Sequence, residues 1–368
     1  MQVINLTNLK RLMHYYYNLR IPLALWGKPS TAKTSMFRQF AQETAKKLGL
    51  KYSEDEFGPD IFTFKIIILS QFDAVDLRGV PYLSNEETRF SPASCLPRIG
   101  QGILFLDEIS NVDPTLVAPV QQLMLEGRIE NLVLPKDAEG KDCYWRVCAG
   151  NRSEDYCLVN EMSLAFLRRT AHFTVEPDLE EIINYFLDKE IDSRVIGYLK
   201  ENPQDLFPKV INETLIEKKA NPFPYTWEMV GRMIKKANKM DIKYIVSSWV
   251  GEDVGIKFWT FTKLYGKFSL DAIMKNPEVE IAKIIKDPQK NSLFYAIISS
   301  FSSLWWRKDK RLTPSKVVEI LVEFPKEMQI VFMSMIIRKR TLELTSRPEL
   351  QSVLKELAPY VNPSSDEE

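Results

Sequence analysis

A short loop near the N-terminus carries residue types that bind phosphate. Residues 27–34 lie between the apolar run Pro22–Trp26 and a segment with helical periodicity. In a phosphate-binding loop, backbone N–H groups surround the phosphates, a lysine reaches the terminal phosphates and a hydroxyl coordinates magnesium. We predict such a site, with Ala32 where a second glycine is usual; an ordinary turn with an exposed lysine is the alternative. The predicted binding residues are Gly27, Lys28, Pro29, Ser30, Thr31, Ala32, Lys33 and Thr34.

Two adjacent carboxylates follow the apolar run Ile103–Leu106, namely Asp107 and Glu108. Ligands bind at the carboxyl edge of open parallel sheets, so both side chains are expected there. In an ATPase, Asp107 would join Thr34 in holding Mg²⁺, and Glu108 would orient and deprotonate the attacking water. A strand that runs into an acidic loop is the alternative. Together with the loop at 27–34, the pair favours ATP hydrolysis.

Two further polar residues follow or precede predicted strands. Asn151 comes after Tyr144–Ala149 and could reach the γ-phosphate or the lytic water; it could also be a turn-forming asparagine. Arg169 precedes His172–Val175 and could stabilise charge in the site of a neighbouring subunit. A solvated arginine at a helix end is the alternative for Arg169. We predict catalytic roles for Glu108, Asn151 and Arg169.

The elements that would position these residues alternate between strands and helices. Strands separated by helices predict an α/β fold with a parallel sheet and helices on both faces. A helix is expected after the loop, ending at Gly49, and another at Pro114–Glu126. Hairpins are expected at Asp76–Ser91, turning at 84–86, and at Ile129–Tyr144, turning near 137–140. The predicted strands are Pro22–Trp26, Ile61–Leu69, Gly102–Leu106, Tyr144–Ala149 and His172–Val175.

The second half of the chain shows helical periodicity and few strand signals. We expect an α/β part at 1–180, a helical part at 181–361 and a disordered acidic tail at 362–368. Phe294–Trp306 is expected to be a buried helix. The other predicted helices are Glu181–Lys189, Thr226–Ala237, Val254–Tyr265, Pro314–Phe324 and Pro325–Arg338.

The composition narrows the functional classes. Lys and Arg total 49 of the 368 residues and Asp and Glu also total 49, a balance that argues against a dedicated nucleic-acid binder. The cysteines form no CxxC pair, which favours free thiols over a zinc site. No segment approaches the roughly 18 apolar residues of a membrane span, and no signal peptide is evident. We therefore expect a cytoplasmic protein. The cysteines are Cys95, Cys143, Cys148 and Cys157.

The order of these motifs resembles the MoxR branch of the AAA+ ATPases, over residues 5–340 or so. That family implies an ATP- and Mg²⁺-dependent ring, usually a homo-hexamer, with a helical lid and a C-terminal helical extension. It also implies remodelling or activation of a partner protein, commonly one with a von Willebrand factor A domain. The segments that carry the resemblance are Asp76–Gly79, Gly102–Ser110, Ala149–Arg152, Met162–Arg169 and Val250–Gly255.

By position in the family, Lys33 and Thr34 match the Walker A motif and Asp107 and Glu108 the Walker B motif. Asn151 matches sensor 1 and Arg169 the arginine finger, while the hairpin at Asp76–Ser91 matches the helix-2 insert. The hairpin near 137 matches the one that precedes sensor 1.

The chain departs from the family in two places. Ser30 and Ala32 replace glycines of the loop, and Tyr225 stands where a sensor 2 arginine is usual. Arg232, about two helical turns further on, could substitute for that arginine; a solvated arginine on the helix is the alternative. A nucleotide-dependent binding or scaffold module with little turnover is therefore one alternative function. An AAA+ nucleic-acid motor is another.

Overall fold

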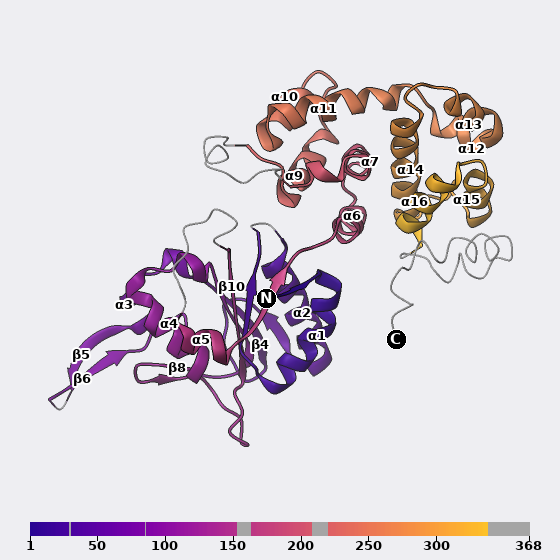
Figure 1. The fold of residues 1–368 in the computed structure, drawn as a ribbon. Coiled ribbons are helices and arrows are strands. Elements are labelled where there is room, and N and C mark those ends of the chain that lie inside the picture. Colours follow the sequence, from indigo (N-terminus) through magenta and orange to yellow (C-terminus); the bar gives the residue numbers. More distant parts are fainter. Residues whose placement is uncertain (29–30, 85, 153–162, 208–219, 338–368) are drawn as a thin grey trace. The chain divides into compact units, whose positions relative to one another are not determined.

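The computed structural model describes the whole chain except residues 29–30, 85, 153–162, 208–219 and 338–368. The chain forms two compact units, Met1–Asp178 and Leu179–Glu368 (Figure 1). The acidic tail predicted at 362–368 lies outside the described residues.

Seven strands form a parallel sheet in the first unit, in the order β1-β11-β2-β10-β7-β4-β3. Because parallel strands point the same way, the carboxyl ends of β2, β10 and β7 lie next to one another at one edge. The strands are β1 (Gln2–Ile4), β2 (Leu23–Trp26), β3 (Lys51–Ser53), β4 (Ile61–Ile68), β7 (Gln101–Asp107), β10 (Tyr144–Gly150) and β11 (Ala171–Val175).

Each central strand is apolar on both faces. In β2, Leu23 and Leu25 pack into the core on one face, whereas Ala24 and Trp26 pack into the core on the other. This pattern explains the uninterrupted apolar runs of the sequence, since a parallel sheet is covered on both sides. The helices α1 (Leu6–Leu19) and α2 (Lys33–Leu48) contribute to the first core, and α4 (Pro114–Glu126) and α5 (Leu164–Arg169) to the second (Figure 1). The predicted α/β class is confirmed.

The two outermost strands, β1 and β3, and the helix α1 were not predicted. Each outer strand has only three residues, too few to show an alternating pattern. The helix α1 did carry a signal, because Leu9, Met13 and Tyr17 are buried and recur every four residues.

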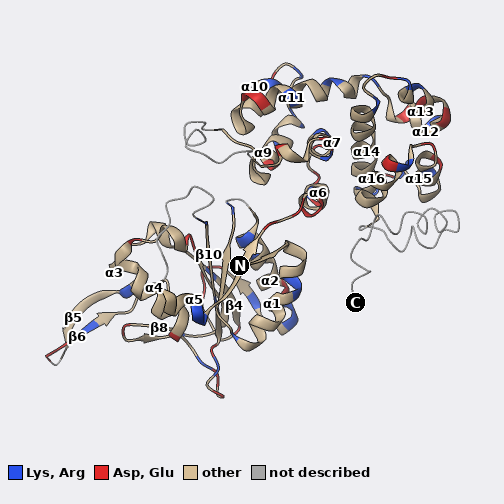
Figure 2. Cartoon of the chain, viewed as in Figure 1, with Lys and Arg blue, Asp and Glu red and all other residues tan. Residues whose placement is uncertain are grey.

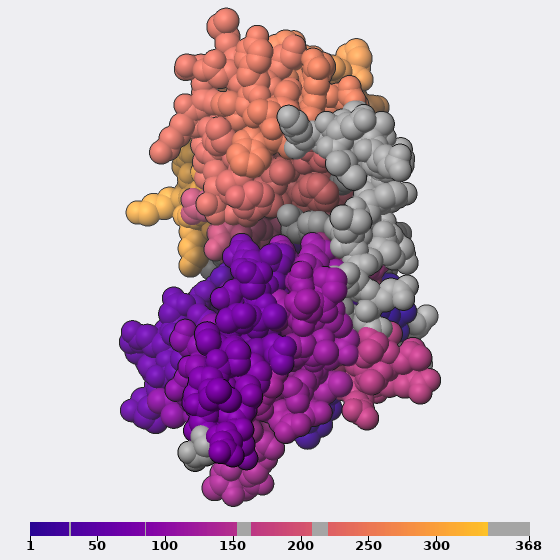
Figure 3. Space-filling model, turned by 90° about the vertical axis from the view of Figure 1, so that its left-hand side faces the viewer, coloured from indigo at the N-terminus to yellow at the C-terminus, as the bar shows by residue number. Residues whose placement is uncertain are grey.

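Both predicted hairpins need correction. Residues 76–78 belong to a helix, α3 (Ala74–Arg78), so the first hairpin consists of β5 (Val80–Ser84) and β6 (Glu87–Ser91). It projects from the first unit (Figure 1) and faces the viewer in Figure 3. The second region contains the short pair β8 (Arg128–Ile129) and β9 (Leu132–Val133), followed by a separate turn closed by a bridge between Lys136 and Asp142.

The second unit is helical in its described residues, as predicted. Its core includes α14, whose Trp305 Nε1–H donates to the Ile336 carbonyl of α16 at 3.2 Å. The helices are α6 (Leu179–Asp188), α7 (Ser193–Glu201), α9 (Pro224–Ile234), α10 (Ile242–Val250), α11 (Glu252–Thr262), α12 (Leu270–Lys275), α13 (Pro277–Ile285), α14 (Lys290–Trp306), α15 (Pro314–Leu321) and α16 (Lys326–Ile336). Basic and acidic residues are scattered over the described helices of this unit (Figure 2). Among the described helices, none has both the length and the apolar composition that a bilayer crossing requires.

Candidate phosphate-binding site

The loop after β2 is held against neighbouring strands by close backbone contacts. Gly27 N–H donates to the Gly150 carbonyl at 3.2 Å. A Cβ atom at Gly27 would lie 2.5 Å from the Val175 carbonyl oxygen, so a side chain there would clash with β11. Pro29 and Ser30 lie outside the described residues. The Thr31 hydroxyl donates to the Lys28 carbonyl at 2.9 Å and closes the described part of the loop.

Ala32 has a left-handed backbone, with φ of 61° and ψ of 17°. This conformation costs about 1–2 kcal/mol for a residue with a Cβ atom, which explains why glycine is usual at this position. Ala32 precedes α2, and no side chain caps this helix at its N-terminus. Backbone N–H groups at such a helix start are suited to bind phosphate.

Lys33 extends into the loop and is only 8% exposed. Its Nζ donates to the carbonyls of Gly27 and Lys28, both at 2.9 Å, and lies 3.2 Å from the Thr31 hydroxyl. A buried ammonium surrounded by carbonyl oxygens is well placed to exchange one of them for a phosphate oxygen.

Thr34 and Asp107 meet across the sheet edge. The Thr34 hydroxyl donates to Asp107 Oδ2 at 2.8 Å. Hydroxyl and carboxylate oxygens are hard ligands of the kind that Mg²⁺ prefers, usually completed by water and substrate phosphates. This pair therefore fits a magnesium ion that also contacts a bound nucleotide.

Glu108 follows in a left-handed conformation, with φ of 58°. Its own N–H donates to Asp107 Oδ1 at 3.0 Å, and its carboxylate accepts a hydrogen bond from the Ser70 hydroxyl. The backbone conformation is unusual for a residue with a side chain, and such conformations cluster at functional sites. The left-handed conformation at Glu108 ends the extended backbone of β7.

Ser70 was not predicted as a site residue. It lies directly after β4, in the 3₁₀ turn Leu69–Gln71. The sequence does hold a signal for it, since a polar residue follows an apolar strand here as Asp107 and Glu108 do after β7. Only the pairing of β4 with β7 shows that the two strand ends are neighbours.

Asn151 joins the site from the end of β10. Its N–H donates to the buried Ser110 hydroxyl at 3.0 Å, which fixes the backbone where the strand ends. The second half of the loop (residues 31–34), the two carboxylates and Asn151 thus line one cavity of about 280 Å³, whereas the described residues Gly27 and Lys28 do not line it. Its described lining residues are Thr31, Ala32, Lys33, Thr34, Ser35, Asp107, Glu108, Gly150 and Asn151.

Arg169 is not among the described residues that line this cavity. It is the last residue of α5 and is exposed. The pKa of Glu126 is lowered mainly by its hydrogen bond with Arg128, with a smaller contribution from the charge of Arg169. Arg169 is therefore available at the surface of the first unit rather than in the cavity of its own chain.

Tyr225 and Arg232 both belong to α9 in the second unit. Tyr225 lies in the first turn of the helix and is 53% exposed. The Arg232 guanidinium donates to the carboxylate of Glu228 one turn earlier. Arg232 thus already has an anionic partner on its own helix.

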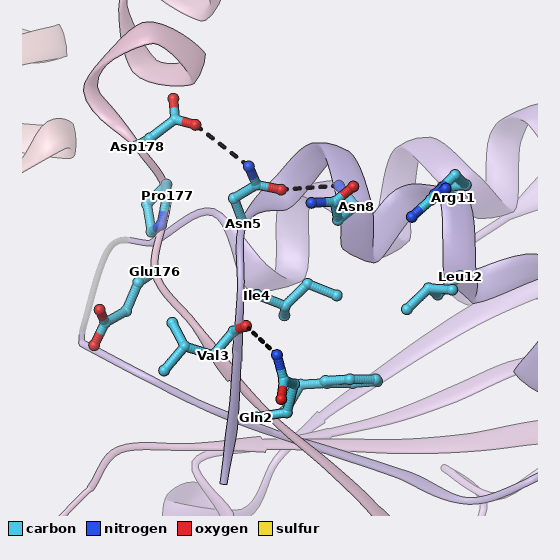
Figure 4. A pocket seen from close by; sticks show the side chains of 11 residues that line it. Gln2, Val3, Ile4, Asn5, Asn8, Arg11, Leu12, Glu176, Pro177 and Asp178 are labelled. Carbon is cyan, nitrogen blue, oxygen red and sulfur yellow. Dashed lines mark hydrogen bonds between the residues drawn. The ribbon is translucent and has the colours of Figure 1, made fainter. Parts of the chain in front are cut away.

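A second, larger cavity of about 650 Å³ lies along β1 and the start of α1 (Figure 4). Asn5 caps α1 there by accepting from the Asn8 N–H at 3.0 Å, and its Nδ2 lies 3.4 Å from Asp178 Oδ2. None of the predicted site residues lines this cavity in the described chain. The buried lysine and the hydroxyl–carboxylate pair line the smaller cavity instead.

The sequence and the structure were compared with known proteins. No protein-family model matches the sequence, and the comparison with curated proteins finds no match. A crystal structure of NtrX from Brucella abortus shares 10% sequence identity with this chain, with a TM-score of 0.35. The match covers 88% of this chain and 67% of the NtrX chain. A second structure of NtrX from this organism, in complex with ADP, shares 13% identity, with a TM-score of 0.32. This match covers 96% of this chain and 68% of the NtrX chain.

Proposed function

We propose that this chain is a magnesium-dependent ATPase of the AAA+ type, similar to the MoxR branch. The observation that carries the proposal is the convergence of Lys33, the Thr34–Asp107 pair and Glu108 on one cavity. These groups supply phosphate binding, metal binding and a base, the three functions that ATP hydrolysis needs.

Each of these residues would have a separate role in ATP hydrolysis. The backbone of the loop and the start of α2 would bind the β- and γ-phosphates, and Lys33 would neutralise part of their charge. Thr34 and Asp107 would hold Mg²⁺, which supplies electrostatic stabilisation of the phosphate oxygens when bound. Glu108 would accept a proton from the attacking water, and Asn151 would orient that water or the γ-phosphate.

We further propose that the active form is a ring, with a homo-hexamer as the expected assembly. The exposed position of Arg169, outside the cavity of its own chain, supports an action on the site of a neighbouring subunit. ATP turnover in such a ring would remodel or activate a client protein, for which the hairpin β5–β6 is a suitable contact. Val80, Tyr82 and Leu83 on this hairpin are 57%, 48% and 81% exposed.

A binding module with little turnover is the second candidate. The left-handed alanine at position 32 favours it, because a methyl group near the phosphates restricts the loop. The two candidates differ in one measurement, the rate of ATP hydrolysis by the purified protein.

The test uses two substitutions and a matched control. Lys33→Ala is expected to abolish nucleotide binding, and Glu108→Gln is expected to retain binding while lowering kcat on the order of 100-fold or more. Lys46→Ala, at the exposed far end of the same helix, is expected to change neither. Binding without hydrolysis by the wild type, at high protein concentration and with Mg²⁺, would favour the binding module. Binding that survives Lys33→Ala would contradict the assigned site.

A further inference from the structure

The imidazole of His172 connects the strand before the loop to the helix that ends in Arg169. Trp26, the last residue of β2, donates its Nε1–H to His172 Nδ1 at 3.0 Å. On the other side of the ring, His172 Nε2 lies 2.9 Å from the Leu167 carbonyl oxygen in α5. One side chain in β11 therefore bridges two elements that are far apart in the sequence.

The partners of His172 determine which nitrogen carries the proton. An indole N–H can only donate and a carbonyl oxygen can only accept, so Nδ1 is the acceptor and Nε2 carries the hydrogen. The Thr170 hydroxyl, 2.7 Å from Nε2, donates to the Phe166 carbonyl and can therefore accept from the same N–H. Burial lowers the pKa of His172, which favours this neutral form.

Aromatic packing reinforces the bridge. The rings of Trp26 and His172 are stacked, with centroids 6.2 Å apart and an angle of 17° between the planes. Phe166, a fully buried residue of α5, meets the His172 ring edge-on at 6.3 Å. A helix as short as α5 has little stability of its own, so these contacts determine where it lies.

Trp26 also contacts the candidate phosphate site. A Cβ atom at Gly150 would lie 3.1 Å from Trp26 Cζ3, so the indole ring packs directly against the end of β10. Gly150 is followed by Asn151 and accepts the hydrogen bond from Gly27 N–H. A continuous set of contacts thus leads from Gly150 through Trp26 and His172 to α5.

We propose that His172 is a positioning residue, which holds α5 so that Arg169 is presented correctly to the neighbouring active site. The inference rests on the proposed ATPase function and adds a residue that acts through Arg169 without touching the nucleotide. Because Arg169 would act on charge that develops in the transition state, His172 should affect kcat and leave nucleotide affinity unchanged.

The test compares His172→Phe in two backgrounds. In the wild type, the substitution removes both hydrogen bonds and is expected to lower kcat by about 10- to 100-fold, with KM for ATP unchanged, as for a misplaced catalytic group. In an Arg169→Ala background it is expected to cause no further loss, since the position of an absent guanidinium has no effect. His172→Gln keeps an acceptor for Trp26 and a donor for Leu167, and is expected to retain most of the activity.

His14→Phe is the matched control, because His14 is the chain's other histidine and is exposed on α1. It is expected to leave kcat unchanged. If His172→Phe does not fold, Trp26→Phe removes the donor, keeps an aromatic ring at this position, and is measured in the same two backgrounds. Equal reductions of kcat in both backgrounds would overturn the inference alone. So would an effect on KM for ATP in place of kcat. A wild type without ATPase activity would overturn the proposed function and the inference with it.

Discussion

Ala32 is one of two described site residues, with Glu108, whose backbone departs from what residues with a Cβ atom favour. Its φ of 61° lies in a region that glycine adopts freely and alanine does not. Lys33 and Thr34, which follow, depend on this turn because it sets the direction in which α2 begins. The strain is thus located where the loop passes into the helix.

Replacing Ala32 with glycine should relieve this strain. We expect Ala32→Gly to raise the free energy of unfolding by up to about 1 kcal/mol, after allowing for the greater entropy of glycine in the unfolded chain. A more relaxed loop should also lower KM for ATP. Thermal denaturation and steady-state kinetics measure both effects.

Ala45→Gly is the control for this prediction, since it makes the same chemical change inside α2. There it should destabilise by about 1 kcal/mol or more, because glycine is unfavourable within a helix and the buried methyl group of Ala45 is lost as well. A loss of stability in Ala32→Gly as large as that in Ala45→Gly would show that position 32 is not strained.

At the scale of elements, β10 is anchored by a buried charge pair at its N-terminal end. Arg146 is 5% exposed and its Nη2 lies 2.6 Å from Asp142 Oδ2. Its Nη1 donates to the Leu123 carbonyl of α4 at 3.4 Å, while Arg20 donates to the Asp142 carbonyl at 3.0 Å. The pair therefore joins β10, α4 and the turn at 137–141.

Removing one partner of the Arg146–Asp142 pair should lower the free energy of unfolding by much more than the intact pair adds to it. Desolvation lowers the pKa of Arg146, and Asp142 opposes this shift. We expect Asp142→Asn to lower the free energy of unfolding by about 3 kcal/mol, because a buried cation is left without its anion. Urea denaturation gives the value. Glu126→Gln, which disrupts the exposed pair with Arg128, is expected to leave stability unchanged within error; a similar loss in both variants would contradict the argument.

At the scale of the whole molecule, the proposed ring predicts that activity depends on assembly. Specific ATPase activity should rise with protein concentration and then reach a plateau, because a single subunit lacks the arginine that completes its site. Measurement of turnover per subunit over a dilution series tests this. Turnover that is independent of concentration, in a protein shown to be monomeric, would contradict action between subunits.

Mixing two strongly impaired variants gives a sharper test of the ring. Arg169→Ala subunits retain Glu108, and Glu108→Gln subunits retain Arg169. In a random 1:1 mixture, roughly a quarter of the interfaces should combine an intact Glu108 with an intact neighbouring Arg169. We therefore expect turnover to rise on mixing well above the low residual turnover of either variant alone. An Arg169→Ala variant with wild-type turnover would exclude the assigned role.

The local sequence was sufficient for the central strands and for most of the residues that meet at the cavity. A run such as Ile103–Leu106 is apolar because both faces of the sheet are covered, and the polar residues after it are placed at the carboxyl edge. Gly49 and Gly127, which have left-handed backbones, mark the C-terminal ends of α2 and α4. Pro114 marks the start of α4. These features depend on neighbours in the chain, so a pattern in the sequence can show them.

Only the tertiary structure decided the strand order and the contacts that follow from it. Ser70 meets Glu108 because β4 pairs with β7, and His172 meets Trp26 because β11 pairs with β2. Pairing between strands that are distant in sequence depends on how whole faces pack, which no short window of residues records. The three-residue strands β1 and β3 likewise exist only because a neighbouring strand is present to pair with them. The sequence by itself thus identified the residues for which we propose ATP binding and hydrolysis, and the fold decided which further side chains contact them.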